Sequence, residues 1–560
     1  MANKLELTWY GKENRIEVEP RLLLENKELS NCALDENTEN MLIHGDNLLA
    51  LKALEKAGYV GKIKCIYIDP PYNTGEAFEN YDDNLEHSIW LNLMYARMRI
   101  LRNLLSDDGF FCCQIDDSEG HYLKTMLDEI YGRSNYLTTI YVRVRYSEKT
   151  LKQDMDFHKE IEQIHIYRKT SLAKPFLEEV ETGFDKFNYR IETFAQPNKK
   201  LELGGKTVEI YSKGSYKIIE EAGNKFGLKE VWASGTILDG NSSGRFFRDY
   251  LTGRYQEDGY GVLYKVYGIG DDMYDYRFFT GPQQVGATKG KYYQGVPKKK
   301  IDAEKIVRKL PISGFVDLAA NFGNCRQEGG AGFRGGKKPE KLIMELLSHF
   351  SSPGDWVLDS FLGSGTTAAV AHKMNRKYIG IEIGEHCYTL CRPRLNKVIQ
   401  GDRTGITKSV NWQGGGGYRF YELAPSLILE DAFGEMVINK EYNADMLAAA
   451  VALHEGFVYA PDKEKFWKQA KANENSYLLT TTRCVTKEFL DSIRSTMDEG
   501  EFLIIACKSF ISGVDKLYSN ISVKKIPQML LNNCEFGKED YNLNIVHPPV
   551  YDDCEVEEDE

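Results

Sequence analysis

The sequence contains no run of eighteen apolar residues, and therefore no segment expected to cross a membrane as a helix. The N-terminal stretch MANKLELTWYGKENRIEVEP lacks the apolar core of a secretory signal. The eleven cysteines are scattered and form no C-x-x-C pair, which argues against a disulfide framework or a zinc site. These absences predict a cytoplasmic protein with reduced thiols, and 560 residues suffice for about two to four domains.

The chain also lacks the net positive charge common in nucleic-acid-binding proteins, since its formal charge is −12. Much of the excess lies in the final segment DDCEVEEDE, an acidic tail expected to be disordered. In contrast, the stripe KGKYYQGVPKKK at 289–300 holds five lysines among aromatic residues and no acid. A local stripe of this kind can bind phosphates on an acidic protein, although it also suits a solvated loop.

Strand and helix patterns alternate in two separate regions. Residues 41–72 fit a strand, a turn, a helix and a strand, and 88–105 fit an amphipathic helix that leads into the strand GFFCCQID. The alternation returns at 355–395. It predicts an α/β fold with a mostly parallel sheet covered by helices. Between about 140 and 330 the apolar runs are short and uneven, which predicts an inserted, less regular domain.

A glycine-containing loop follows the strand in WVLDSFLGSGTTAAV, which ends at Asp359. Gly363 and Gly365 allow a sharp turn and let a ligand lie against bare main chain. The next strand ends with Glu382, where an acid commonly holds the two hydroxyls of a ribose. The loop therefore predicts a nucleoside-containing cofactor. Gly363, Gly365 and Ala368 also match the dinucleotide pattern G-x-G-x-x-A, and a tight turn without a ligand is the alternative.

The stretch IKCIYIDPPYNTGEAFENY at 63–81 ends an apolar strand on Asp69. The Asp69 carboxylate and the Pro70 carbonyl can accept hydrogen bonds from an exocyclic amine on a nucleobase, freeing the nitrogen lone pair. Pro70 and Pro71 fix the backbone and remove competing N–H donors. Tyr72 offers a flat face for base stacking, worth roughly 1–3 kcal/mol. Together these features predict methyl transfer to an amino group.

Other interpretations of this tetrapeptide are less complete. It could be a turn that merely ends a strand, because Asp-Pro and Pro-Pro are common turn dipeptides. A nucleotide-dependent oxidoreductase has no evident use for it. Methylation at a ring carbon needs a cysteine nucleophile, and no Pro-Cys stands here. The amine chemistry requires neither a metal nor a covalent intermediate.

DPPYNTG together with DSFLGSGTT resembles the amino-methyltransferases that use S-adenosyl-L-methionine. The order of tetrapeptide, insert and glycine loop resembles the β class of DNA amino-methyltransferases. Two further segments, GKYYQGVP and VNWQGGGGYRFYEL, resemble the modification (Mod) subunits of Type III restriction systems. The similarity spans about residues 38–423. It implies a Rossmann-like α/β methyltransferase core in permuted order, with an inserted target recognition domain and a C-terminal α/β region.

The resemblance also implies the domain boundaries. Residues 1–140 would form the catalytic half of the core, 141–330 the target recognition domain, and 331–423 the cofactor-binding half. The region 424–560 carries no motif, and subunit contacts are a role open to it.

The site residues of the core follow from the two motifs and from two further segments that resemble the family, LIHGDNLLALKAL with Asp46 and FRGGKKPEKLIMELL with Lys338 and Pro339. The catalytic residues would be Asp69, Pro70, Pro71 and Tyr72. The residues lining the cofactor pocket would be Asp46, Lys338, Pro339, Asp359, Phe361, Gly363, Gly365, Thr366, Thr367 and Glu382. The candidate DNA contacts in the insert are Arg245, Arg248, Lys291, Lys298, Lys299 and Lys300.

The function implied is transfer of a methyl group to N6 of adenine in double-stranded DNA by base flipping. The implied partners are a second copy of the chain and a helicase–nuclease restriction (Res) subunit. A solitary methyltransferase, an N4-cytosine enzyme or an RNA-directed enzyme would use the same chemistry, although N4-cytosine enzymes tend to have serine in place of Asp69. Two other classes are a non-catalytic DNA-binding subunit and a nucleotide-dependent oxidoreductase.

Overall fold

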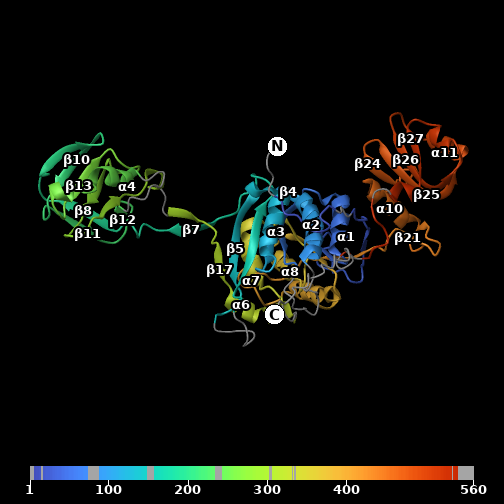
Figure 1. Ribbon diagram of the computed structural model, residues 1–560, viewed down its shortest axis with the longest axis horizontal. Helices are drawn as coiled ribbons and strands as arrows, with labels where there is room; N and C mark the ends of the chain where they lie inside the picture. The colour runs from blue at the N-terminus through green and yellow to red at the C-terminus, as the bar shows by residue number, and fades with distance from the viewer. Residues whose placement is uncertain are drawn as a thin grey trace, which may run out of the picture. The chain divides into compact units, whose positions relative to one another are not determined.

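The protein consists of two compact units in the computed structural model (Figure 1). The first unit joins Met1–Phe176 to Ser313–Glu560, and the second is the insert Leu177–Ile312. The described residues are 6–13, 17–72, 87–147, 157–233, 242–301, 306–330, 332, 336–531, 534–539 and 541. The predicted disorder of the acidic tail concerns residues outside these ranges.

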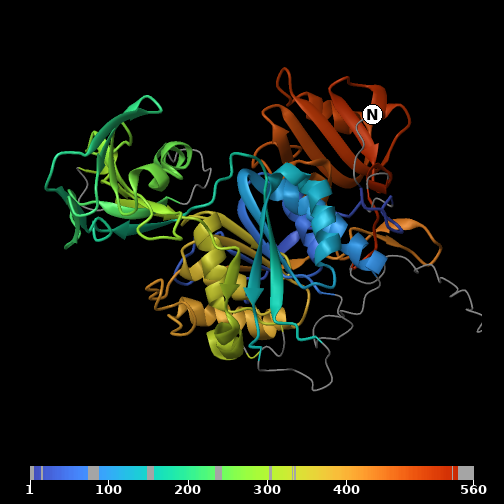
Figure 2. The ribbon, with the colours of Figure 1, turned by 60° about the vertical axis from the view of Figure 1, so that its left-hand side comes forward.

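Within the described residues, a ten-stranded sheet forms the centre of the first unit (Figures 1 and 2). The strand order is β1-β20-β2-β19-β18-β3-β4-β6-β5-β17. The strands from β20 to β4 run parallel, which confirms the predicted parallel α/β sheet. In sheet order the strands are Leu23–Glu25, Arg419–Leu423, Met41–His44, Lys377–Glu382, Trp356–Asp359, Ile63–Ile68, Leu105–Ile115, Ile161–Arg168, Tyr136–Arg143 and Phe315–Asp317.

Helices cover both faces of this sheet (Figure 2). Crossovers between parallel strands are right-handed, so crossovers that run in opposite directions along the sheet place their helices on opposite faces. Helices α1 (Asn47–Leu54), α2 (His87–Leu104) and α3 (Gly120–Leu127) pack in sequence on one face. Helices α7 (Glu340–Phe350), α8 (Thr366–Lys373) and α9 (Arg392–Ile399) pack in sequence on the other. No helix in the described ranges is both long and apolar enough to span a bilayer.

The central strand β3 is buried almost throughout, because both neighbours are parallel strands and helices lie above and below. On α2, Trp90, Leu91, Met94 and Met98 recur at helical spacing and are buried in the same core. This pattern of burial explains why the region before residue 140 could be recognised from its sequence.

The insert is narrower than the predicted range 141–330. Strand β6 pairs antiparallel with β4, and β5 pairs with β6, so both strands extend the sheet of the first unit. Strand β17 then adds to β5 in parallel. Only two of the eight residues of β5, Ile140 and Val142, are buried, because β5 lies near the sheet edge. Because so few of its residues are buried, the hydrophobic pattern of this segment did not indicate a strand of the first unit.

The insert itself contains a six-stranded antiparallel sheet in the order β12-β15-β14-β13-β10-β9. Its strands, in that order, are Lys229–Ala233, Gly290–Gln294, Tyr276–Thr280, Leu263–Tyr267, Lys206–Tyr211 and Lys199–Leu203. The first and last strands of the insert, β7 (Glu178–Thr182) and β16 (Ile306–Leu310), pair with each other. Its other strands and α-helices in the described ranges are β8 (Tyr189–Thr193), β11 (Tyr216–Glu220), α4 (Ser242–Phe246) and α5 (Tyr255–Asp258).

The C-terminal region has its own five-stranded sheet, in the order β23-β24-β25-β26-β27. The last three strands are parallel, and α10 and α11 cover them. The elements are β21 (Ile428–Glu430), β22 (Met436–Ile438), α10 (Ala444–Glu455), β23 (Val458–Tyr459), β24 (Ala470–Asn473), β25 (Ser476–Val485), α11 (Lys487–Arg494), β26 (Phe502–Phe510), β27 (Ile521–Lys525) and α12 (Gln528–Leu531).

A buried ionic cluster joins α7, α8 and α9. The Glu340 carboxylate lies 2.9 Å from Lys373 Nζ and 2.9 Å from the Arg394 guanidinium, and all three side chains are fully buried. Arg394 also donates to Thr366 Oγ1 at 2.8 Å and to the Ser364 carbonyl at 3.2 Å. The cluster therefore fixes the beginning of α8 as well as the packing of the helices.

We predict that Glu340→Gln destabilises the first unit by about 3–5 kcal/mol, because it leaves two buried cations with one fewer carboxylate. Urea unfolding followed by circular dichroism measures this loss. The control is Lys341→Gln, the adjacent half-exposed position, which should stay within about 0.5 kcal/mol of the parent. Equal unfolding midpoints for the two variants would contradict the role of the cluster.

Candidate active site

Parallel pairing of β3 with β18 brings the two predicted motifs together. Cys65 lies opposite Val357, and Ile66 lies opposite Leu358. The residues that follow each strand therefore emerge at the same edge of the sheet, with Asp69 next to the loop that begins after Asp359. The DPPY segment and the glycine loop, far apart in the sequence, form one site.

The acceptor segment is held rigidly. Pro70 and Pro71 restrict the backbone, and the Trp90 indole on α2 donates to the Pro71 carbonyl at 2.7 Å. Among the described residues no donor reaches the Pro70 carbonyl. The carbonyl of Pro70 can therefore serve as a second acceptor beside the Asp69 carboxylate.

Lys338 contacts the predicted catalytic carboxylate directly. Its Nζ lies 3.1 Å from Asp69 Oδ2, and the Tyr72 hydroxyl donates to Asp69 Oδ1 at 2.6 Å. Lys338 Nζ also donates to the Tyr72 hydroxyl at 2.9 Å. The sequence predicted Lys338 and Pro339 as cofactor contacts. In the structure the Lys338 ammonium lies on the acceptor side of the site, and Pro339 immediately precedes α7.

Glu162 and Gln114 belong to this site and were missed at the sequence level. Glu162 Oε2 lies 2.9 Å from the Tyr72 hydroxyl oxygen and 3.2 Å from Lys338 Nζ, and it accepts from the Gln114 amide. Gln114 Oε1 in turn accepts from the Tyr67 hydroxyl at 2.6 Å. The only sequence signal was an acid within the run IEQIHIY, which mixes isoleucines with polar residues, in a region interpreted as part of the insert.

Burial and charge set the proton affinities of the acceptor side. Burial raises the pKa of Asp69 from its ordinary 3.8 to about 6, with Lys338 opposing the rise and Glu162 adding to it. Burial also pushes the pKa of Glu162 upwards, but the Lys338 charge and hydrogen bonds from Gln114 and Tyr72 outweigh it and leave that pKa lowered. The two carboxylates thus differ in proton affinity although they share one ammonium.

Asp359 shapes the glycine loop instead of pointing out of it. Its Oδ1 accepts from the Phe361 N–H at 2.9 Å, and its Oδ2 accepts from Thr367 Oγ1 at 2.6 Å. Gly365 has φ +78° immediately before α8, a conformation that favours glycine. Burial raises the pKa of Asp359 to about 7, and the charges of Asp69 and Glu382 add to the rise.

The other side of the site fits a nucleoside-containing cofactor. Glu382, at the end of β19, accepts from the Gly363 N–H at 2.6 Å and from the Gly384 N–H at 2.9 Å. A Cβ placed on Gly363 would meet no atom within 4 Å, so this bare main chain borders open space. The Ser360 hydroxyl is buried and has no hydrogen-bond partner among the described residues. A carboxylate, a bare glycine and an unpartnered hydroxyl are suitable contacts for a ribose and its substituents.

Two of the predicted cofactor residues, Asp46 and Thr366, make hydrogen bonds that stabilise the fold. Asp46 caps α1, since its Oδ1 accepts from the N–H groups of Leu48 and Leu49 at 2.8 and 3.1 Å. Its other oxygen lies 3.3 Å from the Arg97 guanidinium. Thr366 accepts from Arg394 and donates to the Lys338 carbonyl at 3.3 Å. Thr366 therefore connects the glycine loop to the main chain of Lys338.

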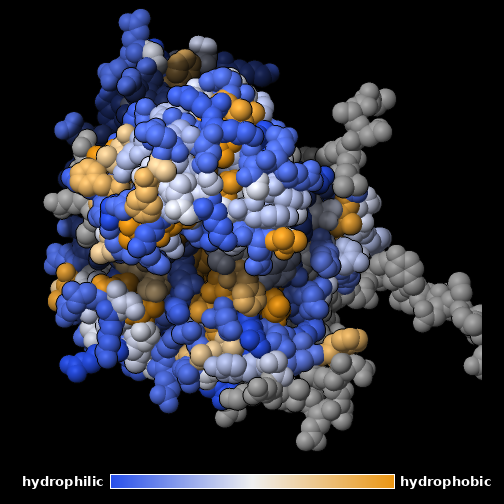
Figure 3. Space-filling model, turned by 90° about the vertical axis from the view of Figure 1, so that its left-hand side faces the viewer, coloured by the Kyte–Doolittle hydropathy of each residue, from blue (hydrophilic) through white to orange (hydrophobic). Residues whose placement is uncertain are grey.

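The predicted DNA contacts all lie in the insert, and they differ in their pairing. Lys291 Nζ lies 2.6 Å from Glu230, and Arg248 lies 2.6 Å from its neighbour Asp249. Arg245 is exposed on α4 without an ion pair among the described residues. Lys298 and Lys299 are exposed within the turn Lys298–Lys300. Figure 3 shows one face of the molecule, on which hydrophilic residues predominate.

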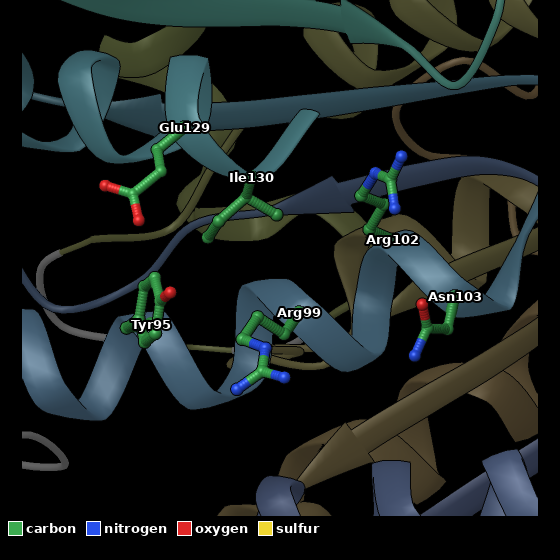
Figure 4. Close-up of a pocket in the computed structure, with 6 residues that line it drawn as sticks. All are labelled: Tyr95, Arg99, Arg102, Asn103, Glu129 and Ile130. Carbon is green, nitrogen blue, oxygen red and sulfur yellow. The ribbon is translucent and has the colours of Figure 1, made fainter. Parts of the chain in front are cut away.

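A separate pocket of about 360 Å³ lies between α2 and the turn Asp128–Gly132 (Figure 4). It is lined by Tyr95, Arg99, Arg102, Asn103, Glu129 and Ile130. Figure 4 shows the two arginines leaving α2 in different directions, so their guanidinium groups do not converge on one anion. The pocket therefore lacks the convergent polar groups of the site at the sheet edge.

Residues 63–392, which include both motifs, match the DNA methylase family. The chain belongs to this family. It is 34% identical over 434 residues to the probable type III restriction-modification enzyme HindVI Mod subunit of Haemophilus influenzae, covering 69% of this chain and 54% of that protein. It is 26% identical over 415 residues to the StyLTI Mod subunit of Salmonella typhimurium (68% and 56%) and 26% identical over 429 residues to the EcoPI Mod subunit of Escherichia phage P1 (67% and 62%).

These matches confirm the predicted resemblance and the methyltransferase fold class. The chain matches between 54% and 62% of the length of these three relatives. The matched residues 63–392 include β3, the insert and the glycine loop.

The raised pKa of Asp69 predicts a pH-dependent stability. A carboxyl group whose folded pKa is about 6 and whose ordinary value is 3.8 destabilises the fold when ionised, and this cost disappears as the pH falls through 6 towards 4. We therefore expect Asp69→Asn to raise the free energy of unfolding by about 1–3 kcal/mol at pH 8, and by clearly less at pH 5.

Urea unfolding at both pH values measures the effect, with Asp108→Asn as the control. The Lys64 ammonium lowers the pKa of Asp108, so that removing the Asp108 charge should destabilise the protein at pH 8. The same sign of change for both variants at pH 8 would refute the assignment.

Proposed function

We propose that the protein is a site-specific DNA methyltransferase that transfers a methyl group from S-adenosyl-L-methionine to N6 of adenine in duplex DNA, after flipping the base out of the helix. The pairing of β3 with β18 carries this proposal, because it sets the Asp69 acceptor beside a loop suited to a nucleoside. Membership of the DNA methylase family supports it.

Asp69 and Pro70 would act on the adenine amino group. Its lone pair is delocalised into the ring, and two acceptors at fixed positions would draw the nitrogen towards a tetrahedral geometry. The Asp69 carboxylate would take one N–H and the Pro70 carbonyl the other. With a pKa of about 6, the Asp69 carboxylate is also suited to accept the proton that the nitrogen gives up.

Tyr72 and the glycine loop would position the reactants. The Tyr72 hydroxyl is held by Asp69 and Glu162, which fixes the ring on which the extruded base would stack. On the other side, Glu382, Gly363 and Ser360 would hold the nucleoside part of the cofactor. Bound S-adenosyl-L-methionine would supply an electrophilic methyl group on a positively charged sulfur.

We further propose that the chain is the modification and site-recognition subunit of a Type III restriction-modification system. Three of its relatives are named Mod subunits. In this role the insert would be the target recognition domain, the protein would form a homodimer, and a helicase–nuclease Res subunit would be its partner. The C-terminal region would be available for subunit contacts.

Single-molecule sequencing of DNA from cells that express the protein tests the activity. We expect N6-methyladenine within one asymmetric motif and its loss in an Asp69→Ala strain, because the variant lacks one of the two acceptors. A binding assay with labelled S-adenosyl-L-methionine should show that Asp69→Ala still binds the cofactor to within about threefold, since the loop contacts are intact.

The same experiment separates the alternatives. N4-methylcytosine marks would identify the cytosine enzyme, and the absence of any mark would favour a non-catalytic DNA-binding subunit. Marks that persist in the Asp69→Ala strain would contradict the proposed mechanism. A nuclease gene beside the gene for this protein would distinguish a restriction system from a solitary methyltransferase.

The pairing of cations in the insert gives a prediction for DNA binding. Lys298→Gln and Arg245→Ala should each weaken binding and reduce the slope of log K against log salt by about 0.9, as expected for loss of one phosphate contact. Lys291→Gln also removes one positive charge, but Glu230 already neutralises Lys291. The slope of log K against log salt for this variant should therefore equal that of the parent. Fluorescence anisotropy with duplex DNA at several salt concentrations measures these slopes, and the opposite ranking would exclude this interface.

A further inference from the structure

Lys338 lies between two carboxylates in the site. Its Nζ is 3.1 Å from Asp69 Oδ2 and 3.2 Å from Glu162 Oε2, and its side chain is 7% exposed. The carboxylates are themselves largely enclosed, with side chains 19% and 15% exposed. A single ammonium therefore balances two enclosed negative charges, one of which is the proposed catalytic acceptor.

This arrangement creates a conflict with the proposed function, on which the inference rests. The target amino group needs the Asp69 oxygen that the Lys338 ammonium holds. If Lys338 had no other counter-ion, its release from Asp69 would leave an unpaired cation in a buried site, which is strongly unfavourable.

We propose that Glu162 is a positioning residue for methyl transfer, which keeps the Lys338 ammonium paired while Asp69 is handed over to the target amino group. Glu162 thereby makes Asp69 available as an acceptor. It acts through Lys338 and touches neither substrate nor cofactor.

Glu162 is well placed for this role because it is fixed from behind. The Gln114 amide donates to Glu162 Oε2, and Gln114 is itself held by the Tyr67 hydroxyl at 2.6 Å. Gln114 is fully buried on β4. The neutral amide stabilises the Glu162 carboxylate without competing for the charge of Lys338.

The lysine is also anchored at its main chain. The Lys338 carbonyl accepts from Thr366 Oγ1 at 3.3 Å at the beginning of α8. Its ammonium can therefore shift between Asp69 and Glu162 by side-chain rotation alone. The two oxygens are both already within 3.2 Å of Nζ, so the required movement is small.

The test is a double-mutant cycle in the full-length protein. Glu162→Gln should lower kcat for methylation of the motif found by sequencing by about tenfold, because Lys338 then stays on Asp69. The dissociation constants for duplex DNA and S-adenosyl-L-methionine should remain within about twofold.

Removal of the ammonium provides the decisive comparison. In the Lys338→Met background, Glu162→Gln should change kcat by less than about twofold, because no cation remains to be held. A tenfold loss in that background would show that Glu162 acts independently of Lys338 and would overturn the proposal. This comparison holds even if Glu162→Gln alone folds poorly, because the double variant contains neither buried charge.

Glu160→Gln is the matched control. Glu160 lies two positions before Glu162, pairs with Arg143 at 3.0 Å and makes no contact with Lys338. Its kcat should equal that of the parent. If the parent and Glu160→Gln methylate DNA and Glu162→Gln methylates equally fast, the inference fails while the proposed function stands. If the parent leaves no methyl mark, the proposed function itself fails.

Discussion

The pairing of β3 with β18 is the constraint on which the site depends. These strands come from parts of the chain separated by the whole insert, and main-chain hydrogen bonds hold them in parallel register. Since carboxyl ends of parallel strands meet at one sheet edge, the register alone fixes which residues can meet there. The insert can then vary without moving the chemistry, because β5, β6 and β17 complete the sheet on either side of it.

The charges at this edge are unbalanced towards the negative. Asp69, Glu162, Asp359 and Glu382 all end or border strands there, while Lys338 is the cation that contacts Asp69 and Glu162. Burial raises the pKa of Asp69 and of Asp359, which means that their ionised forms are under electrostatic strain. A ligand with a positive charge near these carboxylates would favour their ionised forms, whereas a pyrophosphate would be repelled by them.

The sequence predicted the parts of the site that are contiguous in the chain. The strand-ending Asp69, the prolines and the glycine loop are local signals, each with a local physical reason. Glu162 and Gln114 could not be predicted, because they join the site only through antiparallel pairing of β6 with β4. The same pairing explains the difference at the insert boundary. The capping role of Asp46 was also hidden, since an acid before a helix fits both a cap and a ligand, and the distances to Leu48, Leu49 and Arg97 show the cap.

Lys338 couples the two halves of the site. Its carbonyl accepts from Thr366 at the end of the glycine loop, and its ammonium contacts Asp69 in the DPPY segment. Under the proposed function, a ligand that orders the loop would restrain the lysine, and a base that takes Asp69 would push the ammonium towards Glu162. By linkage, any preference that cofactor binding imposes on the position of Lys338 must appear as an equal change in the affinity for the flipped base. Under the proposed function, one lysine shared between the two sides of the site would make the binding of cofactor and base interdependent.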